Sequence, residues 1–311
     1  MIVAGSPIRK VGSYLCSLAA LLSVQLACGG GSHGDPGPGV VPVVSHVFVL
    51  VEENHSYNQV IGNSAMPYTN SLAHKYSLAT KYSANRFNSL PNYFMLTVGD
   101  LITTDDSYTG TVTQDNVVRA LTKAGKSWKV YAESLPSVGY LGASQPPYGK
   151  DHVPFVYFKD VKESSEQSGN VVPFSQLADD IQNDNLPDYA MIVPNFQSDG
   201  HDCPPNMSDC ADNDKLQYID NWISENIAPL IKSSAFGDGV LIYTWDESDI
   251  NDTSNPDKLV ATILVGSKVK SGYQSTTPYQ HQSTLRLTME LLGMKDFPGL
   301  ASSAADMNEF F

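Results

Sequence analysis

Short apolar runs alternate along the chain with longer amphipathic segments. Five runs are rich in β-branched or aromatic residues, which predicts buried strands at residues 46–51, 127–133, 188–195, 239–247 and 258–266. Apolar residues between these runs recur at a helical period, which predicts helices at residues 66–83, 89–99, 117–124, 174–183, 211–234 and 283–293. Strands that alternate with helices indicate an α/β fold, with a mostly parallel central sheet covered by helices on both faces.

Residues 1–27 have the pattern of a secretory signal peptide. Two basic residues precede an apolar stretch that is marginal in length for a membrane span, and small residues follow. The tripeptide ending at Cys28 is similar to the cleavage box of bacterial lipoproteins, in which this Cys is lipidated. Residues 28–39 are Gly-rich and predict a flexible tether. We expect an exported bacterial protein that is periplasmic, anchored to the outer membrane through Cys28, or secreted, with its folded domain at residues 40–311.

The composition of the chain limits the classes of molecule that this domain can bind. The chain has 311 residues, 41% of them hydrophobic, and a formal net charge of -14. An acidic protein lacks the basic stripe that nucleic-acid binding needs. An anionic substrate remains compatible with it, because a bound metal ion inverts the local field. Cys203 and Cys210 predict a disulfide in an exported protein. The alternative, a metal site with two thiolates, lacks a second Cys pair.

Three predicted strands run into polar side chains. The residues concerned are Glu52, Glu53, Asn54 and His55, then Asp199, His201 and Asp202, then Asp246 and Glu247. A single acidic strand end is often only the cap of the next helix. Three of them at one edge of a sheet, with His281 just before a helix, predict a site for a divalent metal ion. Glu52 is expected to face solvent and His55 to position Asn54.

Ser89 begins the segment SLPNY at the start of a predicted helix. A structural role is one explanation, because Ser is a common N-cap and Pro91 suits the first helical turn. A nucleophile is the other. The N-terminus of a helix holds phosphate groups well, and a metal ion beside the hydroxyl would lower its pKa. The residues by themselves leave both explanations open.

Many segments resemble, in order, the motifs of a bacterial phosphoesterase family. They are ENHSYNQVIGN, MPYTNSLA, SLPNYFMLTVG, GKSWKVYAESLP, DHVPFVYF, PNFQSDGHDC, DNWI, TWDES and HQSTLR, and they cover nearly all of residues 46–293. The family contains acid phosphatases and phosphatidylcholine-type phospholipases C and belongs to the alkaline phosphatase superfamily. The resemblance therefore implies an alkaline-phosphatase-like core.

The resemblance also implies a role for each matching residue. Ser89 matches the nucleophile, and His201 or His281 would protonate the leaving group. The implied metal ligands are Glu53, Asn54, Asp246 and Glu247, with Asp199 at a second metal position. The implied phosphate contacts are Asn54, Asn92 and His152. One divalent metal ion of unknown identity is expected, and a second is compatible with the pattern.

These observations together predict an exported, metal-dependent phosphoesterase. We expect it to hydrolyse phosphomonoesters, as an acid phosphatase does, through a phosphoseryl intermediate. The substrate would be a small phosphate ester or a phospholipid. Two alternatives remain open, namely a phosphodiesterase of the phospholipase C type and a surface binding protein with a degraded active site. Sulfatase-like chemistry is disfavoured, because SLPNY lacks the Arg of the sulfatase motif.

Overall fold

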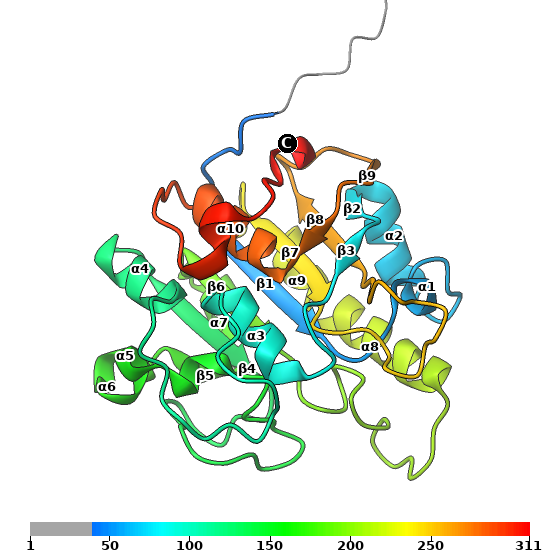
Figure 1. Ribbon diagram of the computed structural model, residues 1–311, viewed down its shortest axis with the longest axis horizontal. Helices are drawn as coiled ribbons and strands as arrows, with labels where there is room; N and C mark the ends of the chain where they lie inside the picture. Colours follow the sequence, from blue (N-terminus) through cyan, green and yellow to red (C-terminus); the bar gives the residue numbers. More distant parts are fainter. Residues whose placement is uncertain (1–38) are drawn as a thin grey trace, which may run out of the picture. The chain divides into compact units, whose positions relative to one another are not determined.

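A central sheet of eight strands organises the structure, a computed structural model that describes residues 39–311 (Figure 1). The strands lie in the order β5-β4-β6-β1-β7-β8-β2-β9. Their bounds are β1 (Val47–Glu52), β2 (Ser77–Ala79), β4 (Trp128–Ala132), β5 (Val171–Pro173), β6 (Tyr189–Val193), β7 (Val240–Trp245), β8 (Thr262–Gly266) and β9 (Tyr273–Ser275). A small second sheet pairs β3 (Tyr82–Ser83) with β10 (Tyr279–Gln280).

The sheet is mostly parallel, as predicted. Strands β5, β4, β6, β1 and β7 run in one direction, and β8 is antiparallel to both of its neighbours. β1 is central, with Val47 paired to Tyr189 of β6 on one side and to Val240 of β7 on the other. All six residues of β1 are buried, which explains its unbroken apolar run. The carboxyl ends of β6, β1 and β7 therefore meet at one edge.

Helices cover the sheet. The longer ones are α2 (Pro67–Lys75), α3 (Ser89–Thr97), α4 (Val117–Lys123), α7 (Gln176–Gln182), α8 (Asp212–Asn226), α9 (Ala228–Lys232) and α10 (His281–Leu291). The short ones are α1 (Tyr57–Val60), η1 (Pro154–Tyr157), α5 (Lys159–Lys162), α6 (Ser165–Ser168), η2 (Gly299–Ser303) and η3 (Asn308–Phe310). α10 packs along α3, and all nine residues of α3 are buried.

The structure differs from the sequence predictions at two helices. The predicted helix at residues 66–83 ends at Lys75, and β2 and β3 follow it. Pairing of β2 with both β8 and β9 satisfies the backbone better than a helix extended past that point, so tertiary contacts override local propensity. The predicted helix at residues 211–234 is two helices that meet at Ile227, because Pro229 has no N–H for the helical ladder.

Some predictions fall beyond the described part of the chain. The signal peptide, the lipidated Cys28 and nearly all of the tether lie within residues 1–38, so they stay predictions. From residue 39 onward, none of the helices combines the length and the apolar character that crossing a membrane would require.

Candidate active site

Acidic side chains from adjacent strands converge at the carboxyl edge of the sheet. Glu53 follows β1, Asp246 follows β7, and Asp199 lies in the segment after β6. The backbone joins these segments, because the N–H of Glu53 donates to Asp199 O and the N–H of Asp246 donates to Glu52 O. Glu53, Asp199 and Asp246 are each fully buried. The edge predicted from the sequence is thus a single acidic cluster with Glu53 at its centre.

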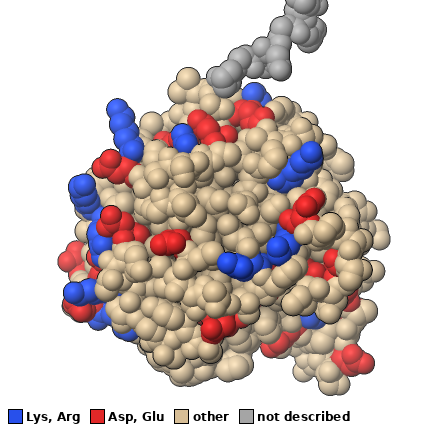
Figure 2. Space-filling model, viewed as in Figure 1, with Lys and Arg blue, Asp and Glu red and all other residues tan. Residues whose placement is uncertain are grey.

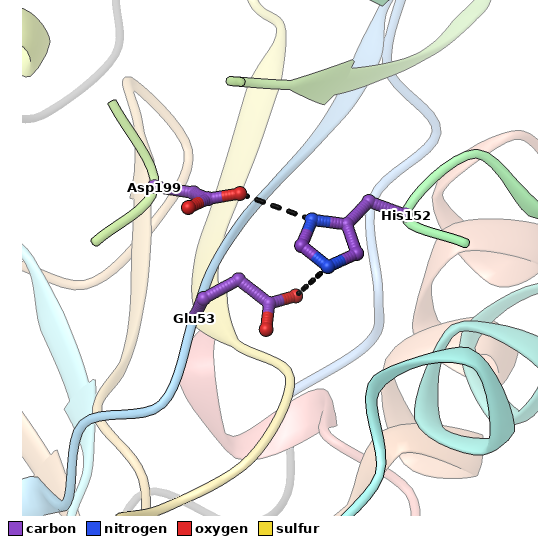
Figure 3. A group of neighbouring side chains, drawn as sticks. All are labelled: Glu53, His152 and Asp199. Atoms are coloured by element: carbon purple, nitrogen blue, oxygen red, sulfur yellow. Dashed lines mark hydrogen bonds and ion pairs between the residues drawn. The ribbon is translucent and has the colours of Figure 1, made fainter. Parts of the chain in front are cut away.

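His152 bridges two of these carboxylates. Its Nδ1 lies 3.0 Å from Asp199 Oδ2, and its Nε2 lies 3.3 Å from Glu53 Oε1. Figure 3 shows the three side chains pointing toward one another from three separate segments. Burial by itself lowers the pKa of His152, but the hydrogen bond to Asp199 and the charge of Asp199 outweigh it, so the net pKa is raised. Both ring nitrogens of His152 therefore face a carboxyl group.

Glu53, Asp246 and Glu247 form a second group, with one oxygen from each within 4.8 Å of the others. Burial and the neighbouring charges raise the pKa of Glu53 well above its usual value. Burial raises the pKa of Asp246 to about 6, and burial together with Asp246 raises that of Glu247 to about 10. Each side chain also has a buried oxygen, Glu53 Oε1, Asp246 Oδ2 or Glu247 Oε2, that accepts no hydrogen bond.

The unpartnered oxygens are consistent with a metal ion. Buried carboxylates are normally hydrogen-bonded, paired or bound to a cation. Here three carboxylates share a small volume, and His152 is the only cationic side chain that the described residues bring within ion-pair distance of them. Oxygen donors of this kind suit hard divalent cations, and the imidazole adds a donor that transition metals prefer. These acidic and His groups could therefore hold a metal ion.

Ser89 lies directly against this cluster. It is the first residue of α3, and its Oγ donates a 2.9 Å hydrogen bond to Glu53 Oε2. The helix begins here because Asn88 has extended backbone and Pro91 fits the first turn. Asp106, from a neighbouring loop, accepts the free N–H of Leu90 at 2.8 Å. Ser89 is only 6% exposed, so its hydroxyl faces the carboxylates rather than open solvent.

Asn54 completes the surroundings of Glu53. Its backbone has φ 58°, a left-handed conformation that Asn tolerates better than most residues. This turn lets its Nδ2 donate to Glu53 Oε2 at 3.2 Å. Glu53 Oε2 thus accepts from both Asn54 and Ser89, while the other oxygen of Glu53 faces His152. Glu53, Asn54 and Ser89 form one hydrogen-bonded unit.

Comparison with known proteins identifies the family. The model of the phosphoesterase family matches residues 62–295. The chain belongs to the phosphoesterase family. The match includes two of the three strand ends, those after β6 and β7, and begins after the β1 end with Glu53 and Asn54. The region matched by the family model therefore contains most of the acidic cluster of this phosphoesterase, apart from Glu53.

Two curated relatives of this phosphoesterase have phosphatase names. Phosphatidylinositol-3-phosphatase of Mycobacterium tuberculosis is 27% identical over 309 residues, covering 98% of this chain and 96% of that protein. The probable acid phosphatase of Kluyveromyces lactis is 29% identical over 251 residues, covering 76% of this chain and 56% of that protein. The chain thus spans little more than half the length of the yeast relative. It is a phosphoric ester hydrolase, and the alternative of a non-enzymatic binding protein is not supported.

Solved structures show the same fold. A protein of the alkaline phosphatase superfamily from Vibrio parahaemolyticus matches with TM-score 0.61 and 11% identity, covering 84% of this chain and 69% of that one. A lipoteichoic acid synthase from Listeria monocytogenes matches with TM-score 0.61 and 14% identity, covering 88% and 78%. The predicted α/β fold with an alkaline-phosphatase-like core is confirmed.

Asn92 lies apart from the acidic cluster of the phosphoesterase. Its Oδ1 accepts from the backbone N–H groups of Asn85 and Arg86, and its Nδ2 donates to the carbonyls of Arg86 and Asn88. These four bonds use the two lone pairs and the two N–H groups of the side-chain amide. Asn92 therefore shapes the segment that precedes Ser89, and the phosphate contact that the resemblance implies stays a prediction.

His281 is fully enclosed. Its Nε2 lies 2.6 Å from the carbonyl oxygen of Asp246, and its Nδ1 lies 3.1 Å from the hydroxyl of Tyr82. Burial lowers the pKa of His281 to about 4, so the ring is neutral and its Nε2–H donates to Asp246 O. Both nitrogens are occupied and point away from solvent. The structure thus brings His281 to the backbone of Asp246, where it positions the acidic pair.

His201 stands at the rim of the cluster. Its side chain is 43% exposed, and its Nδ1 lies 3.0 Å from Asp202 Oδ1. Its ring stacks on Phe196 and lies 5.8 Å from the ring of His152, centre to centre. The backbone N–H of His201 donates to Asp199 Oδ1, which ties the rim to the cluster. The predicted Cys203–Cys210 disulfide is present and closes the next loop.

Three residues differ from expectation or were missed. Glu52 is completely buried, so the expectation that it faces solvent is wrong. His55 binds the backbone carbonyl of Glu53 at 2.7 Å, so it holds the peptide unit that joins Glu53 to Asn54. Tyr93 was not predicted, yet its ring stacks on His152 at 5.4 Å, and its buried hydroxyl interacts with Glu53. Its position four residues after Ser89, on the same helix face, could have indicated this.

Proposed function

We propose that this phosphoesterase is an exported phosphomonoesterase that transfers the phosphoryl group of its substrate to Ser89. The observation that supports this most directly is the Ser89 hydroxyl, which donates to Glu53 Oε2 inside a cluster of buried carboxylates. A hydroxyl with its proton directed at a carboxylate leaves the oxygen lone pairs free to face an incoming phosphorus atom. The same side chain serving only as a helix cap would need no acidic cluster around it.

The proposed metal ligands are Glu53, Asn54, Asp246 and Glu247. A divalent cation bound there would lower the pKa of the Ser89 hydroxyl and neutralise charge on the phosphoryl oxygens. Asp199 would take part in a second site together with Glu53 and His152. The bridging position of His152 supports a second role for that residue, because its imidazolium form can supply the positive charge without a second ion.

In the proposed reaction, side chains of this protein carry out the attack on phosphorus and the proton transfers. Ser89 Oγ attacks phosphorus as its proton passes to Glu53 Oε2, and the bond from phosphorus to the leaving oxygen breaks in line. We propose that His201 gives a proton to that oxygen, since it is the exposed imidazole at the rim. Water entering from the leaving-group side then attacks the phosphoserine, which releases inorganic phosphate and restores Ser89. Electrostatic placement supplies most of the rate enhancement.

The proposed substrates are phosphomonoesters. The names of both curated relatives describe monoester phosphatases, one of them acting on phosphatidylinositol 3-phosphate. The relative of that name also matches the present chain over nearly its whole length. Phosphoinositides and small soluble monoesters are therefore the first substrates to test. Export is part of the proposal, supported by the signal-like N-terminal sequence and by the disulfide.

Turnover of p-nitrophenyl phosphate tests this function. Wild type should hydrolyse it, Ser89→Ala should lose at least about 10³-fold in kcat, and a chelator should abolish activity until a divalent metal is added back. Rapid acid quenching followed by mass spectrometry should find phosphate on the peptide that contains Ser89. Equal activity of Ser89→Ala and wild type would exclude the nucleophile, and activity that is indifferent to chelator would exclude the metal.

A further inference from the structure

Two cations without a carboxylate partner come from two joined segments, Arg86 between β3 and α3 and Lys258 before β8. Arg86 is exposed, and within residues 39–311 it is the one arginine whose guanidinium makes no ion pair or hydrogen bond. Arg119 and Arg286 each bind carboxylates. Lys258 likewise has no carboxylate within ion-pair distance, and its Nζ lies 5.0 Å from the ring centre of Phe87. Arg86 is adjacent in sequence to Phe87, so the ring contact of Lys258 brings the second cation to the segment that carries the first.

Hydrogen bonds hold this segment in place. Asn92 Oδ1 accepts from the backbone N–H groups of Asn85 at 3.1 Å and Arg86 at 3.0 Å, and Asn92 Nδ2 donates to Arg86 O at 3.1 Å. The N–H of Ala84 donates to Lys258 O at 2.9 Å, which joins the two cation-bearing segments. The backbone under Arg86 is therefore fixed before any ligand arrives, and little backbone entropy is lost on binding.

The segment that carries Arg86 leads directly into the proposed nucleophile. Arg86 precedes Ser89 by three residues, and Asn88, with extended backbone, is the N-cap just before Ser89. Asp106, an acidic side chain that contacts this segment, has its oxygens engaged by Asn88 Nδ2 and the N–H of Leu90. In Figure 2, basic side chains gather near the middle of the face where Figure 1 places the connection between β3 and α3.

We propose that Arg86 and Lys258 form a subsite for a second phosphate group on the substrate, the one that is not transferred. This inference rests on the proposed function, and it narrows the substrate to phosphomonoesters that carry another phosphate. A guanidinium binds phosphate through two parallel hydrogen bonds, and an ammonium adds a point charge. The carboxylate cluster repels anions unless a cation is bound, so positive side chains near Ser89 would help to attract an anionic substrate.

A matched pair of substrates tests the subsite. myo-Inositol 1,3-bisphosphate and myo-inositol 3-phosphate differ only in the second phosphate. Wild type should prefer the bisphosphate by about tenfold or more in kcat/KM, and two cleavable phosphates account for only about twofold of this. Arg86→Gln should bring the ratio down to about two, Arg86→Lys should keep part of it, and raised salt should reduce it. The exposed Lys232→Gln, on α9, is the matched control and should keep the full preference.

Other results would overturn the proposal. An unchanged preference in both Arg86→Gln and Lys258→Gln would exclude the subsite. An equal loss on the two substrates would also contradict it, because that pattern assigns Arg86 to the transferred phosphate or to the placement of Ser89. Wild type and Arg86→Gln should also be compared on phosphatidylinositol 3-phosphate in vesicles, where the second phosphate is part of a lipid. A preference for the substrate with the second phosphate that depends on Arg86, in either assay, supports the subsite.

A binding measurement separates this inference from the proposed function. Calorimetric titration of Ser89→Ala with inositol 1,3-bisphosphate needs no turnover. Binding should weaken about tenfold when Arg86→Gln is added to Ser89→Ala. If wild type lacks phosphatase activity while this loss of affinity is seen, the proposed function fails and the subsite stands. If phosphatase activity is present and affinity is unchanged, only the subsite fails.

Discussion

Two buried acidic regions of this phosphoesterase differ in how their oxygens are partnered. Asp180, on α7, is 2% exposed and accepts from Lys129 Nζ at 2.5 Å and from the Tyr131 hydroxyl at 2.7 Å. The cluster around Glu53 is equally buried, but one oxygen each of Glu53, Asp246 and Glu247 accepts no hydrogen bond. A buried carboxylate with its partners in place stabilises a fold, whereas several without partners destabilise it. We infer from this difference that the cluster around Glu53 binds a ligand such as a cation, whereas Asp180 stabilises the fold.

Glu53→Gln should have the largest effect on activity. The substitution keeps the size of the side chain but removes the charge that links Ser89, His152 and the two other acids. We expect kcat/KM to fall by at least about 10³-fold. The free energy of unfolding of the metal-free protein should stay the same or rise, because burial and the neighbouring acids disfavour a charge at this position. A chemical unfolding curve with chelator checks this, and a marked loss of stability would place Glu53 in the same structural class as Asp180.

Asp180→Ala should show the reverse pattern. Removal of this carboxylate leaves Lys129 and Tyr131 without their acceptor. We expect the free energy of unfolding to fall by about 2 kcal/mol, a value reduced from that of fully buried pairs because Lys129 is 21% exposed. The kcat of the folded protein should stay within about twofold of wild type. A large drop in kcat with unchanged stability would erase the difference between the two regions.

The stabilisation of the folded protein by a divalent metal ion should depend on pH. The pKa of Asp246 is raised to about 6 and that of Glu247 to about 10, so the folded, metal-free protein retains protons there that the unfolded chain releases. Its stability is therefore favoured at low pH and decreases as pH rises through these values. A divalent cation must displace those protons, so its stabilising effect should be larger at pH 8 than at pH 5. Thermal unfolding with and without metal at both values measures this. An equal shift at both would place the metal elsewhere.

His201→Gln should have the smallest effect, and only with poor leaving groups. The side chain lies at the exposed rim, outside the unpartnered cluster. We expect kcat/KM to fall about tenfold for an alkyl phosphate, whose leaving oxygen needs a proton. For p-nitrophenyl phosphate, with its acidic leaving group, the value should hardly change. A loss that is the same for both substrates would show that His201 positions the cluster instead of donating a proton.

Much of the fold and part of the site could be predicted from local pattern. Strand β1 and helix α3 follow from an apolar run and a helical period, because both signals depend on neighbouring residues alone. The position of β2 could not be predicted, since it depends on pairing with β8 and β9, which lie far along the chain. The roles implied for Asn92 and His281 depended on matched motifs, and a motif does not reveal which atoms the rest of the fold already occupies.

The sequence by itself determined that acids, amides and imidazoles follow three strands and that a serine opens a helix, because these are facts of local order. Only the tertiary structure decided that Ser89 donates to Glu53, that His152 bridges Glu53 and Asp199, and that His281 donates to the backbone carbonyl of Asp246. The physical reason is that hydrogen bonds and charge interactions act over a few ångströms in space. Residues 53, 89, 152 and 199 come within that range only when parallel strands place their carboxyl ends at one edge.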